Sequence, residues 1–380
     1  MIYLALAYYY LGPFRSIALL SYLLSVVGWR NLRSVSVLEF FVVVYLLVRT
    51  AIGVQETSFL VGLLYLRLYW GFLFFYFYFK ANKTSLDSLF VALCLVTIAE
   101  YLAVNLNPGL IGFLPNYQQT ELLLDHLSTA GLLGGVHSFG GNRTVSGVLL
   151  LAIFIHFDRA HSKLRWVALI GTILCFSGLA LVMTIVYLVM RNATVRHSPY
   201  MLAVAVGGFI IVGQGEDLFY RASFAYFQDV ILEYKLEQID RAMQMLFAGP
   251  EVLFIGAHGG ETESLEVPGY SLTFGDFLFL EFLVNYGVVG SLLIAAVFVA
   301  NLNRTNAWPL LVIVAGTFHY HVIFSLPGQV IVAWFLNRSR GHIPNGKELR
   351  MGKDWLSALR FQAGRLRRGK SSRDEAVLEA

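Results

Sequence analysis

The sequence predicts an all-α, polytopic membrane protein, and two observations carry this prediction. Of the 380 residues, 57% are apolar and only 14% are charged, whereas soluble domains are nearer half apolar and a quarter charged. The apolar residues also form continuous runs along the whole chain. A segment that crosses a bilayer must pair its backbone polar groups internally, so such runs predict spanning helices. The composition excludes a soluble enzyme with a single anchor, a disordered protein and a nucleic-acid-binding protein.

Basic residues between the apolar runs predict the topology. By the positive-inside rule, such groups lie in the cytoplasm, so the chain crosses the membrane an even number of times between successive groups. Residues 338–380 are expected to be a basic cytoplasmic tail that follows a transmembrane domain of residues 1–337. The groups are Arg30/Arg33, Lys80/Lys83, Arg159/Lys163/Arg165, Arg191/Arg196, Arg304 and the tail from Arg338 to Arg373.

The longer intervals between these groups each accommodate two spanning helices, because one span needs about 20 apolar residues. Two of the intervals also contain a polar stretch that is expected to form a periplasmic loop, at residues 107–141 and, larger, at residues 214–273. The pairs of spans lie in residues 35–79 (about 35–53 and 58–79), residues 85–157 and residues 198–300.

The shorter intervals predict short or re-entrant helix pairs. Residues 166–190 are too few for two full helices, so Ser177-Gly178 is expected to turn such a pair. Residues 308–337 make another, broken between Tyr320 and Gly328. Residues 1–29 form either one span or a short pair broken at Gly12-Pro13. The chain is therefore expected to contain about ten to twelve helices with a cytoplasmic C-terminus.

The larger outer loop contains a predicted amphipathic helix. In residues 229–248, apolar residues recur at roughly helical spacing, and Gly249-Pro250 then provides a stop. We expect this helix to lie over the outer mouth of the bundle. Its apolar positions are Val230, Ile231, Tyr234, Ile239, Met243, Leu246 and Phe247.

Ionisable residues within the predicted spans are costly and mark partners or cavities. Arg67 lies near the middle of its apolar run and needs a partner, for which Glu39 and Glu100 are candidates. Two interpretations stay open for Arg67, namely a buried ion pair that locks helices and a cationic site in a central cavity.

Basic residues on the predicted outer side are few, and an enzyme acting there on a lipid diphosphate must use some of them. Arginine suits this task because its planar fork binds two phosphate oxygens and stays charged. Arg143, in the stretch SFGGNRTVSG, is the best placed, since it lies at the outer end of a span after a Gly-Gly pair. The alternative for each of these residues is a surface ion pair. The set is Arg15, Arg49, Arg67, Arg143, Arg221, Lys235 and Arg241.

Candidates for a general base are a carboxylate or a neutral imidazole close to such a phosphate site. His258, Asp276 and the pair His319 and His321 are the candidates, although a lone histidine more often has a structural role. The sequence contains no Walker A motif, no HExxH motif and no evident acidic metal cluster in the first outer loop. Neither a metal nor another cofactor is therefore indicated.

Five stretches of this chain resemble the O-antigen polymerase and ligase superfamily, which includes the Wzy-type repeat-unit polymerases. These are residues 131–157, 164–191, 234–260, 276–293 (with Gly287 and Gly290) and 318–336. Ligases of the superfamily have His-Asn where this chain has Asp276-Phe277, which favours a polymerase. Two further departures are Lys235, where the outer-loop helix commonly starts with Arg, and Ser177-Gly178, which lacks the arginine of the family's Ser-Arg-Gly.

The resemblance implies a metal-independent glycosyltransferase with a GT-C-like fold in the bacterial inner membrane. Its donor would be an oligosaccharide on undecaprenyl diphosphate and its acceptor a second lipid-linked repeat unit. Arg143, Arg241 and Lys235 are expected to bind the diphosphate, with Arg221 in reserve. Asp276 or His258 is expected to act as base, with His319 near the cavity and Arg67 as a cavity charge.

Two other functions remain open from the sequence, an O-antigen ligase of the same fold and a flippase or transporter of lipid-linked glycans. Besides the bilayer and the glycolipid, a chain-length regulator and a flippase are candidate partners, and no nucleic acid is expected.

Overall fold

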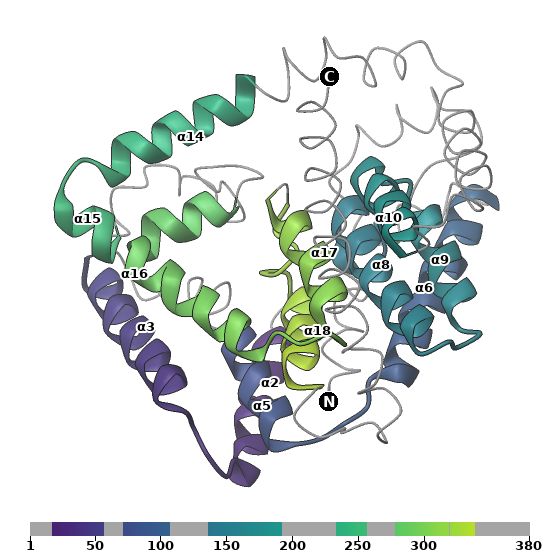
Figure 1. Ribbon diagram of the computed structural model, residues 1–380, viewed down its shortest axis with the longest axis horizontal. Coiled ribbons are helices and arrows are strands. Elements are labelled where there is room, and N and C mark those ends of the chain that lie inside the picture. The colour runs from purple at the N-terminus through teal and green to yellow at the C-terminus, as the bar shows by residue number, and fades with distance from the viewer. Residues whose placement is uncertain are drawn as a thin grey trace, which may run out of the picture. The chain divides into compact units, whose positions relative to one another are not determined.

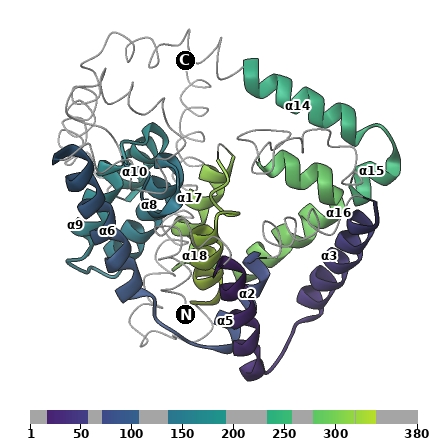
Figure 2. The same cartoon turned by 180° about the vertical axis from the view of Figure 1, so that it is seen from behind.

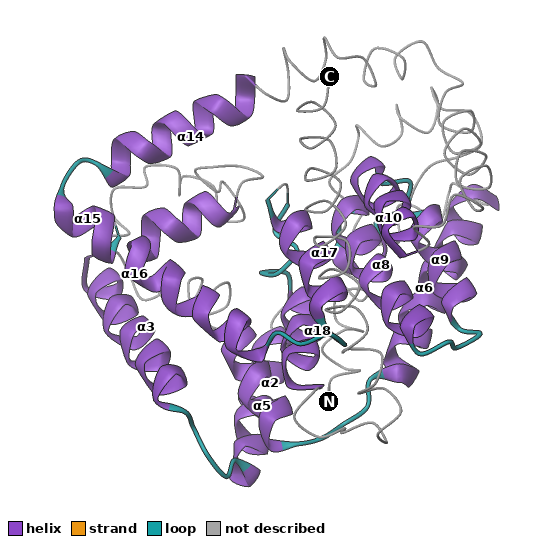
Figure 3. Ribbon diagram, viewed as in Figure 1, coloured by secondary structure: helices purple, strands orange, loops and turns teal. Residues whose placement is uncertain are grey.

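Every regular element in the part of the chain that the structure describes is a helix (Figure 3), as the all-α prediction requires. Two of these helical segments, Asp87–Leu106 and Phe282–Asn301, are long and apolar enough to cross a membrane. The chain divides into two units, residues 1–337 and 338–380. The computed structural model describes residues 17–56, 71–106, 136–191, 233–256, 278–318 and 320–338.

The described elements are labelled in Figure 1 and seen from behind in Figure 2. Two of them are short 3₁₀ helices, η2 (Gly28–Asn31) and η6 (Ser138–Gly140). The α-helices are α2 (Ile17–Val27), α3 (Val37–Glu56), α5 (Gly71–Ala81), α6 (Asp87–Leu106), α8 (Arg143–Arg159), α9 (Arg165–Leu174), α10 (Gly178–Arg191), α14 (Glu233–Leu246), α15 (Pro250–Ile255), α16 (Leu278–Asn301), α17 (Ala307–Thr317) and α18 (Leu326–Asn337).

Helix α8 is the central element of the larger hydrophobic core. Every residue from Val145 to Asp158 is buried, and α8 packs against α9, α10 and α17. A helix that is apolar on all sides is stable only when other elements surround it. The stretch that follows the Gly-Gly pair is therefore the inside of the bundle, and α8 holds its first residue, Arg143, at the edge of the core.

The predicted short pair in residues 166–190 is present as α9 and α10. The chain turns at Cys175–Ser177, where Phe176 has a φ of 48°, and α10 begins at Gly178. Helix α9 has 10 residues and is thus about 15 Å long, half of a typical hydrocarbon core. The start of α9 and the end of α10 are joined, because Asp158 accepts a hydrogen bond from Arg165 at 3.1 Å and also pairs with Arg191.

The second predicted short pair, in residues 308–337, is present as α17 and α18. Its ends also meet, since the Asn306 side chain donates a hydrogen bond to the carbonyl of Phe335 at 3.0 Å. The break ends earlier than the predicted Gly328, because Ser325 caps α18. The Ser325 hydroxyl accepts the N–H of Gly328 at 3.1 Å, which starts the helix at Leu326.

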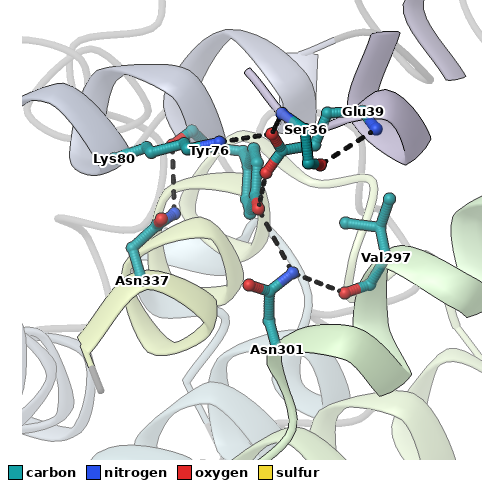
Figure 4. Close-up of polar contacts among 7 residues, drawn as sticks. All are labelled: Ser36, Glu39, Tyr76, Lys80, Val297, Asn301 and Asn337. Atoms are coloured by element: carbon teal, nitrogen blue, oxygen red, sulfur yellow. Dashed lines mark hydrogen bonds and ion pairs between the residues drawn. The ribbon is translucent and has the colours of Figure 1, made fainter. Parts of the chain in front are cut away.

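Buried polar contacts tie together the ends of α3, α5, α16 and α18 (Figure 4). Ser36 and Glu39 form a capping box at the start of α3, in which Glu39 accepts the N–H of Ser36 at 2.7 Å. The same carboxylate forms an ion pair with Lys80 and accepts a hydrogen bond from the Tyr76 hydroxyl at 2.5 Å. Asn301 donates to that hydroxyl at 3.2 Å, and Asn337 donates to the Tyr76 carbonyl at 3.0 Å. One network thus fixes four helix ends.

Further contacts extend this layer to the remaining helices of the core. His156, in the last turn of α8, contacts Asp87, the first residue of α6, at 2.9 Å. Trp334, near the end of α18, donates to the carbonyl of Thr84 at 2.9 Å, and Asn82 donates to the carbonyl of Gly28 at 3.1 Å. The helix ends that adjoin the basic groups of the sequence are therefore connected to one another.

Candidate functional site

Arg143 is the first residue of α8 and its side chain is exposed. Asn142 caps the helix, because its side-chain oxygen accepts the N–H of Thr144 at 2.7 Å. The N-terminal end of a helix carries a partial positive charge, and the guanidinium adds a full one next to it. This end of α8 therefore has a positive local potential, and the binding of a diphosphate by Arg143 stays a prediction.

The segment before α8 is folded tightly onto the first turn of that helix. Ser138 has a φ of 50° and Gly141 a φ of 70°. The Ser146 hydroxyl accepts the N–H of Gly140 at 2.8 Å and donates to the carbonyl of His137. A Cβ atom on Gly140 would lie 2.6 Å from the Ser146 oxygen. Gly140 is thus required by close packing and Gly141 by its left-handed backbone conformation.

Glu100 anchors this segment from below. It is buried on α6, and its carboxylate accepts the N–H of Ser138 at 2.9 Å. The hydroxyls of Thr97 and Ser138 are 2.6 Å apart. His137 is right-handed and Ser138 left-handed, a succession of conformations that forms a concave anion-binding nest of N–H groups. The protein thus supplies its own carboxylate as the anion beneath the segment.

The turn between α9 and α10 completes the surroundings of Arg143. The Ser177 hydroxyl donates to that of Thr144 at 3.3 Å, and the carbonyl of Leu174 accepts the N–H of Val136 at 3.3 Å. Gly147 allows α8 to lie close to α10, because a Cβ atom there would lie 3.0 Å from that of Ala180. We refer to residues 97–100, 136–146 and 175–177 as the Arg143 site.

The positive charge of the Arg143 site resides on Arg143, because His137 is kept neutral. Burial lowers the pKa of His137 from its usual 6.5 to about 4, and the nearby charge of Arg143 acts in the same direction. At neutral pH the imidazole adds no charge. His137 was not among the candidate bases named from the sequence, although its position six residues before Arg143 was an available signal.

Arg241 and Lys235 lie on a different part of the fold. Arg241 is on α14 and makes an exposed ion pair with Glu237, one turn earlier, at 3.3 Å. An exposed pair of this kind contributes about 0.3–0.5 kcal/mol, so it leaves the guanidinium available to a ligand. Lys235 is in the first turn of α14. Helix α14 packs against α15 and α16, whereas α8 packs against α9 and α17.

Arg49, which the sequence placed among the outer basic residues, has a structural role. It is only 4% exposed. Its guanidinium donates to the carbonyls of Ile255 at 3.1 Å, Asn285 at 3.0 Å and Gly256 at 3.2 Å. The Asn285 carbonyl lies next to the break in α16, where Gly287 has a φ of 62°, and the other two lie at the C-terminal end of α15. Arg49 thus binds backbone carbonyls of two helices, next to a break in one and at the end of the other.

Gly287 and Gly290, the paired glycines of the stretch 276–293, allow α3, α15 and α16 to pack closely together. A Cβ on Gly287 would lie 2.4 Å from the carbonyl oxygen of Phe254, and one on Gly290 would lie 2.8 Å from the ring of Tyr45. The Tyr45 hydroxyl donates to the carbonyls of Tyr286 at 2.5 Å and Ile255 at 3.1 Å. The pattern therefore marks a close crossing of backbones.

The predicted pairing of Arg67 with Glu39 or Glu100 stays a prediction. Glu39 pairs with Lys80 and Tyr76, and Glu100 binds the backbone of Ser138. Arg67 itself lies outside the described residues. The same holds for four other predicted site residues, namely Asp276, His258, His319 and Arg221.

Within the described ranges, no group of three or more His, Cys, Asp or Glu side chains could hold a metal ion. Comparisons with family models, with curated proteins and with solved structures found no match. The Arg143 site and the resemblance stated above are therefore the basis for the functional conclusion.

Proposed function

We propose that this protein is a polytopic inner-membrane glycosyltransferase that polymerises lipid-linked oligosaccharide repeat units at the periplasmic face. The growing glycan passes from undecaprenyl diphosphate to the next lipid-linked repeat unit. The observation that carries the proposal is Arg143, an exposed guanidinium at the N-terminus of a buried helix, in one of the stretches that resemble the Wzy-type polymerases.

Two features of the fold support the membrane part of the proposal. The helices expose large apolar residues in stripes, such as Val182, Val186 and Val189 on α10, which lie on one face of the helix and suit contact with lipid. The helix ends next to the basic groups are joined by contacts such as Asp158 with Arg165 and Arg191. An even number of crossings places both ends of an interval on the same side of the membrane, and such contacts agree with that placement.

The reaction needs a leaving group that is stabilised and an acceptor that is deprotonated. An acceptor hydroxyl oxygen forms a bond to the anomeric carbon of the donor, and the bond from that carbon to the diphosphate oxygen breaks. The acceptor proton goes to a base, for which Asp276 and His258 are the candidates. Undecaprenyl diphosphate leaves with the electron pair of the broken bond.

Arg143 would stabilise the charge that develops on the diphosphate. Its fork can bind two oxygens at once, and the N-terminus of α8 strengthens the local positive potential. Arg241 and Lys235 on α14 remain candidates for a second contact, with Arg221 in reserve. His319 stays a candidate near the cavity.

The first test is to profile the lipid-linked glycans of a strain that lacks this protein. The proposal expects that only single repeat units, not joined into polymer, are attached to lipid. Long polymer stranded on undecaprenyl diphosphate would instead indicate an O-antigen ligase. Glycan accessible only from the cytoplasmic side would indicate a flippase or transporter.

The second test is to compare the variants Arg143→Lys and Arg143→Ala in a complemented strain. Lysine keeps the charge but loses the bidentate fork, so Arg143→Lys should give shortened chains and Arg143→Ala should give single repeats. Expression is measured in parallel. Full chain length in both variants at normal expression would show that Arg143 does not bind the diphosphate.

A further inference from the structure

Helix α14 carries a continuous stripe of exposed apolar side chains. Leu236, Ile239 and Met243 of α14 are exposed, as is Phe247, which directly follows the helix and donates its N–H to the carbonyl of Met243 at 2.9 Å. Their spacing of three, four and four residues places them on one face. Met243 is 44% exposed and Phe247 is 64% exposed. An apolar stripe of this length, about 16 Å, is unusual on a surface that faces only water.

The other two faces of α14 have different surroundings. Gln238, Ala242 and Leu246 repeat every four residues and are buried, and the last two pack in a small core with Val252 of α15 and Val284 of α16. The polar face carries exposed residues, namely Glu237, Asp240, Arg241 and Gln244. Helix α14 therefore has one face toward protein, one polar face and one apolar face between them.

The apolar face continues onto neighbouring elements. Phe254 and Ile255 of α15 are exposed. The carbonyl of Ile255 is bound by Tyr45 and Arg49 of α3, so the end of α15 lies against the end of α3 (Figures 1 and 2). At that end α3 itself exposes apolar side chains along one stripe, which includes Val44, Leu47 and Val48.

We propose that the stripe of α14, together with Phe254 and Ile255, is embedded in the acyl-chain boundary of the bilayer leaflet on the predicted periplasmic side. Three features favour lipid over a second protein as the occupant. The stripe itself contains no charged residue, it adjoins the apolar stripe of α3, which the sequence predicts to span the membrane, and the neighbouring face of α14 is charged. This division is typical of helices that lie in the plane of a membrane interface.

The proposal changes the expected position of α14. The helix lies in the leaflet beside the bundle and not over its outer mouth. Arg241 falls two residues before Met243, so it points to nearly the opposite side of the helix and faces water. The inference rests on the proposed membrane-spanning arrangement, but not on the glycosyl-transfer chemistry.

The experiment measures the accessibility of single spin labels in proteoliposomes that contain the full chain. Met243→Cys and Phe247→Cys report on the stripe, and Gln244→Cys is a matched control on the polar face one residue away. Leu292→Cys, at an exposed position of α16, reports on a spanning helix. The unaltered chain gives the background from Cys94 and Cys175, which are both buried. The collision rate of each spin label is measured with oxygen, which concentrates in lipid, and with a water-soluble nickel chelate.

The proposal expects a higher ratio of oxygen to nickel collisions at positions 243 and 247 than at position 244. Nickel accessibility at 243 equal to that at 244, with position 292 still in lipid, would overturn the proposal and leave the membrane-spanning arrangement intact. Protection of 243 and 247 from both reagents would mean that protein covers the stripe, which also overturns it. Nickel accessibility at position 292 would reject the spanning arrangement as well.

Discussion

The ion pair between Glu39 and Lys80 is deeply buried, and its loss should destabilise the bundle strongly. The side chains are 3% and 9% exposed, and the carboxylate also binds Tyr76 and the N–H of Ser36. Glu39→Gln keeps the shape but leaves the Lys80 ammonium without its countercharge, and Lys80→Met leaves the carboxylate without its cation. Removal of one partner of a buried pair costs about 3–5 kcal/mol.

The size of the effect follows from the contacts that remain. In Lys80→Met, Glu39 keeps its two other hydrogen bonds, so we expect a loss of about 3 kcal/mol, at the lower end of that range. In Glu39→Gln, the buried ammonium loses its charged partner, and we expect about 4 kcal/mol. The double variant leaves no unpaired charge, so its loss should be smaller than the sum by about 1–3 kcal/mol.

The assay is equilibrium unfolding of the purified protein in mixed micelles with increasing denaturing detergent. The exposed pair of Arg241 and Glu237 provides a matched control, since Arg241→Ala should cost about 0.3–0.5 kcal/mol. Single-variant losses as small as that of the control, or losses at Glu39 and Lys80 that simply add, would refute the reasoning. Either result would mean that water reaches the pair.

Three further predictions concern backbone strain, helix capping and protonation. Gly287→Ala should lower stability by about 1–3 kcal/mol, because the φ of 62° is unfavourable for alanine and its Cβ would clash with the carbonyl of Phe254. Gly178→Ala is the control and should be neutral or stabilising, because a Cβ there has no atom within 4 Å. Thermal unfolding compares the two variants. Asn142→Ala should cost about 1 kcal/mol in the same assay, and a loss below 0.3 kcal/mol would contradict the cap (roughly the error of such measurements). The folded state keeps His137 neutral with a pKa of about 4, so stability should fall as pH decreases from about 6.5 to about 4. His137→Gln should flatten that part of the profile, and an unchanged profile would be contrary to the burial of this imidazole.

Charge and spacing in the sequence were sufficient to predict the short helix pairs. Basic groups on both sides of residues 166–190 predicted an even number of crossings, and the interval is too short for two full spans. The chain indeed turns at Cys175–Ser177 between α9 and α10. Helical periodicity likewise predicted α14, and its end before Gly249-Pro250 was correct. These features are local, so the sequence contains all the information that they need.

The role of each arginine depended on contacts that are distant in sequence. Arg49 and Arg143 are the same residue type and both lie on the predicted outer side. Arg49 binds carbonyls 206 and 236 positions away, whereas Arg143 is exposed at the start of α8. No local pattern distinguishes them, because the acceptors that Arg49 uses lie at the end of α15 and at the break in α16, both far away in the sequence.

The sequence by itself determined that this chain is helical, apolar and divided by basic groups, because composition and spacing act over a few turns. It also singled out Arg143, since the residues that form its cap and glycine turn are adjacent in the chain. Only the tertiary structure decided that Glu39 pairs with Lys80, 41 positions away, and that α14 turns part of its apolar face outward. Those outcomes depend on which helices pack together, because burial selects the partners of a charge and the faces of a helix that remain exposed.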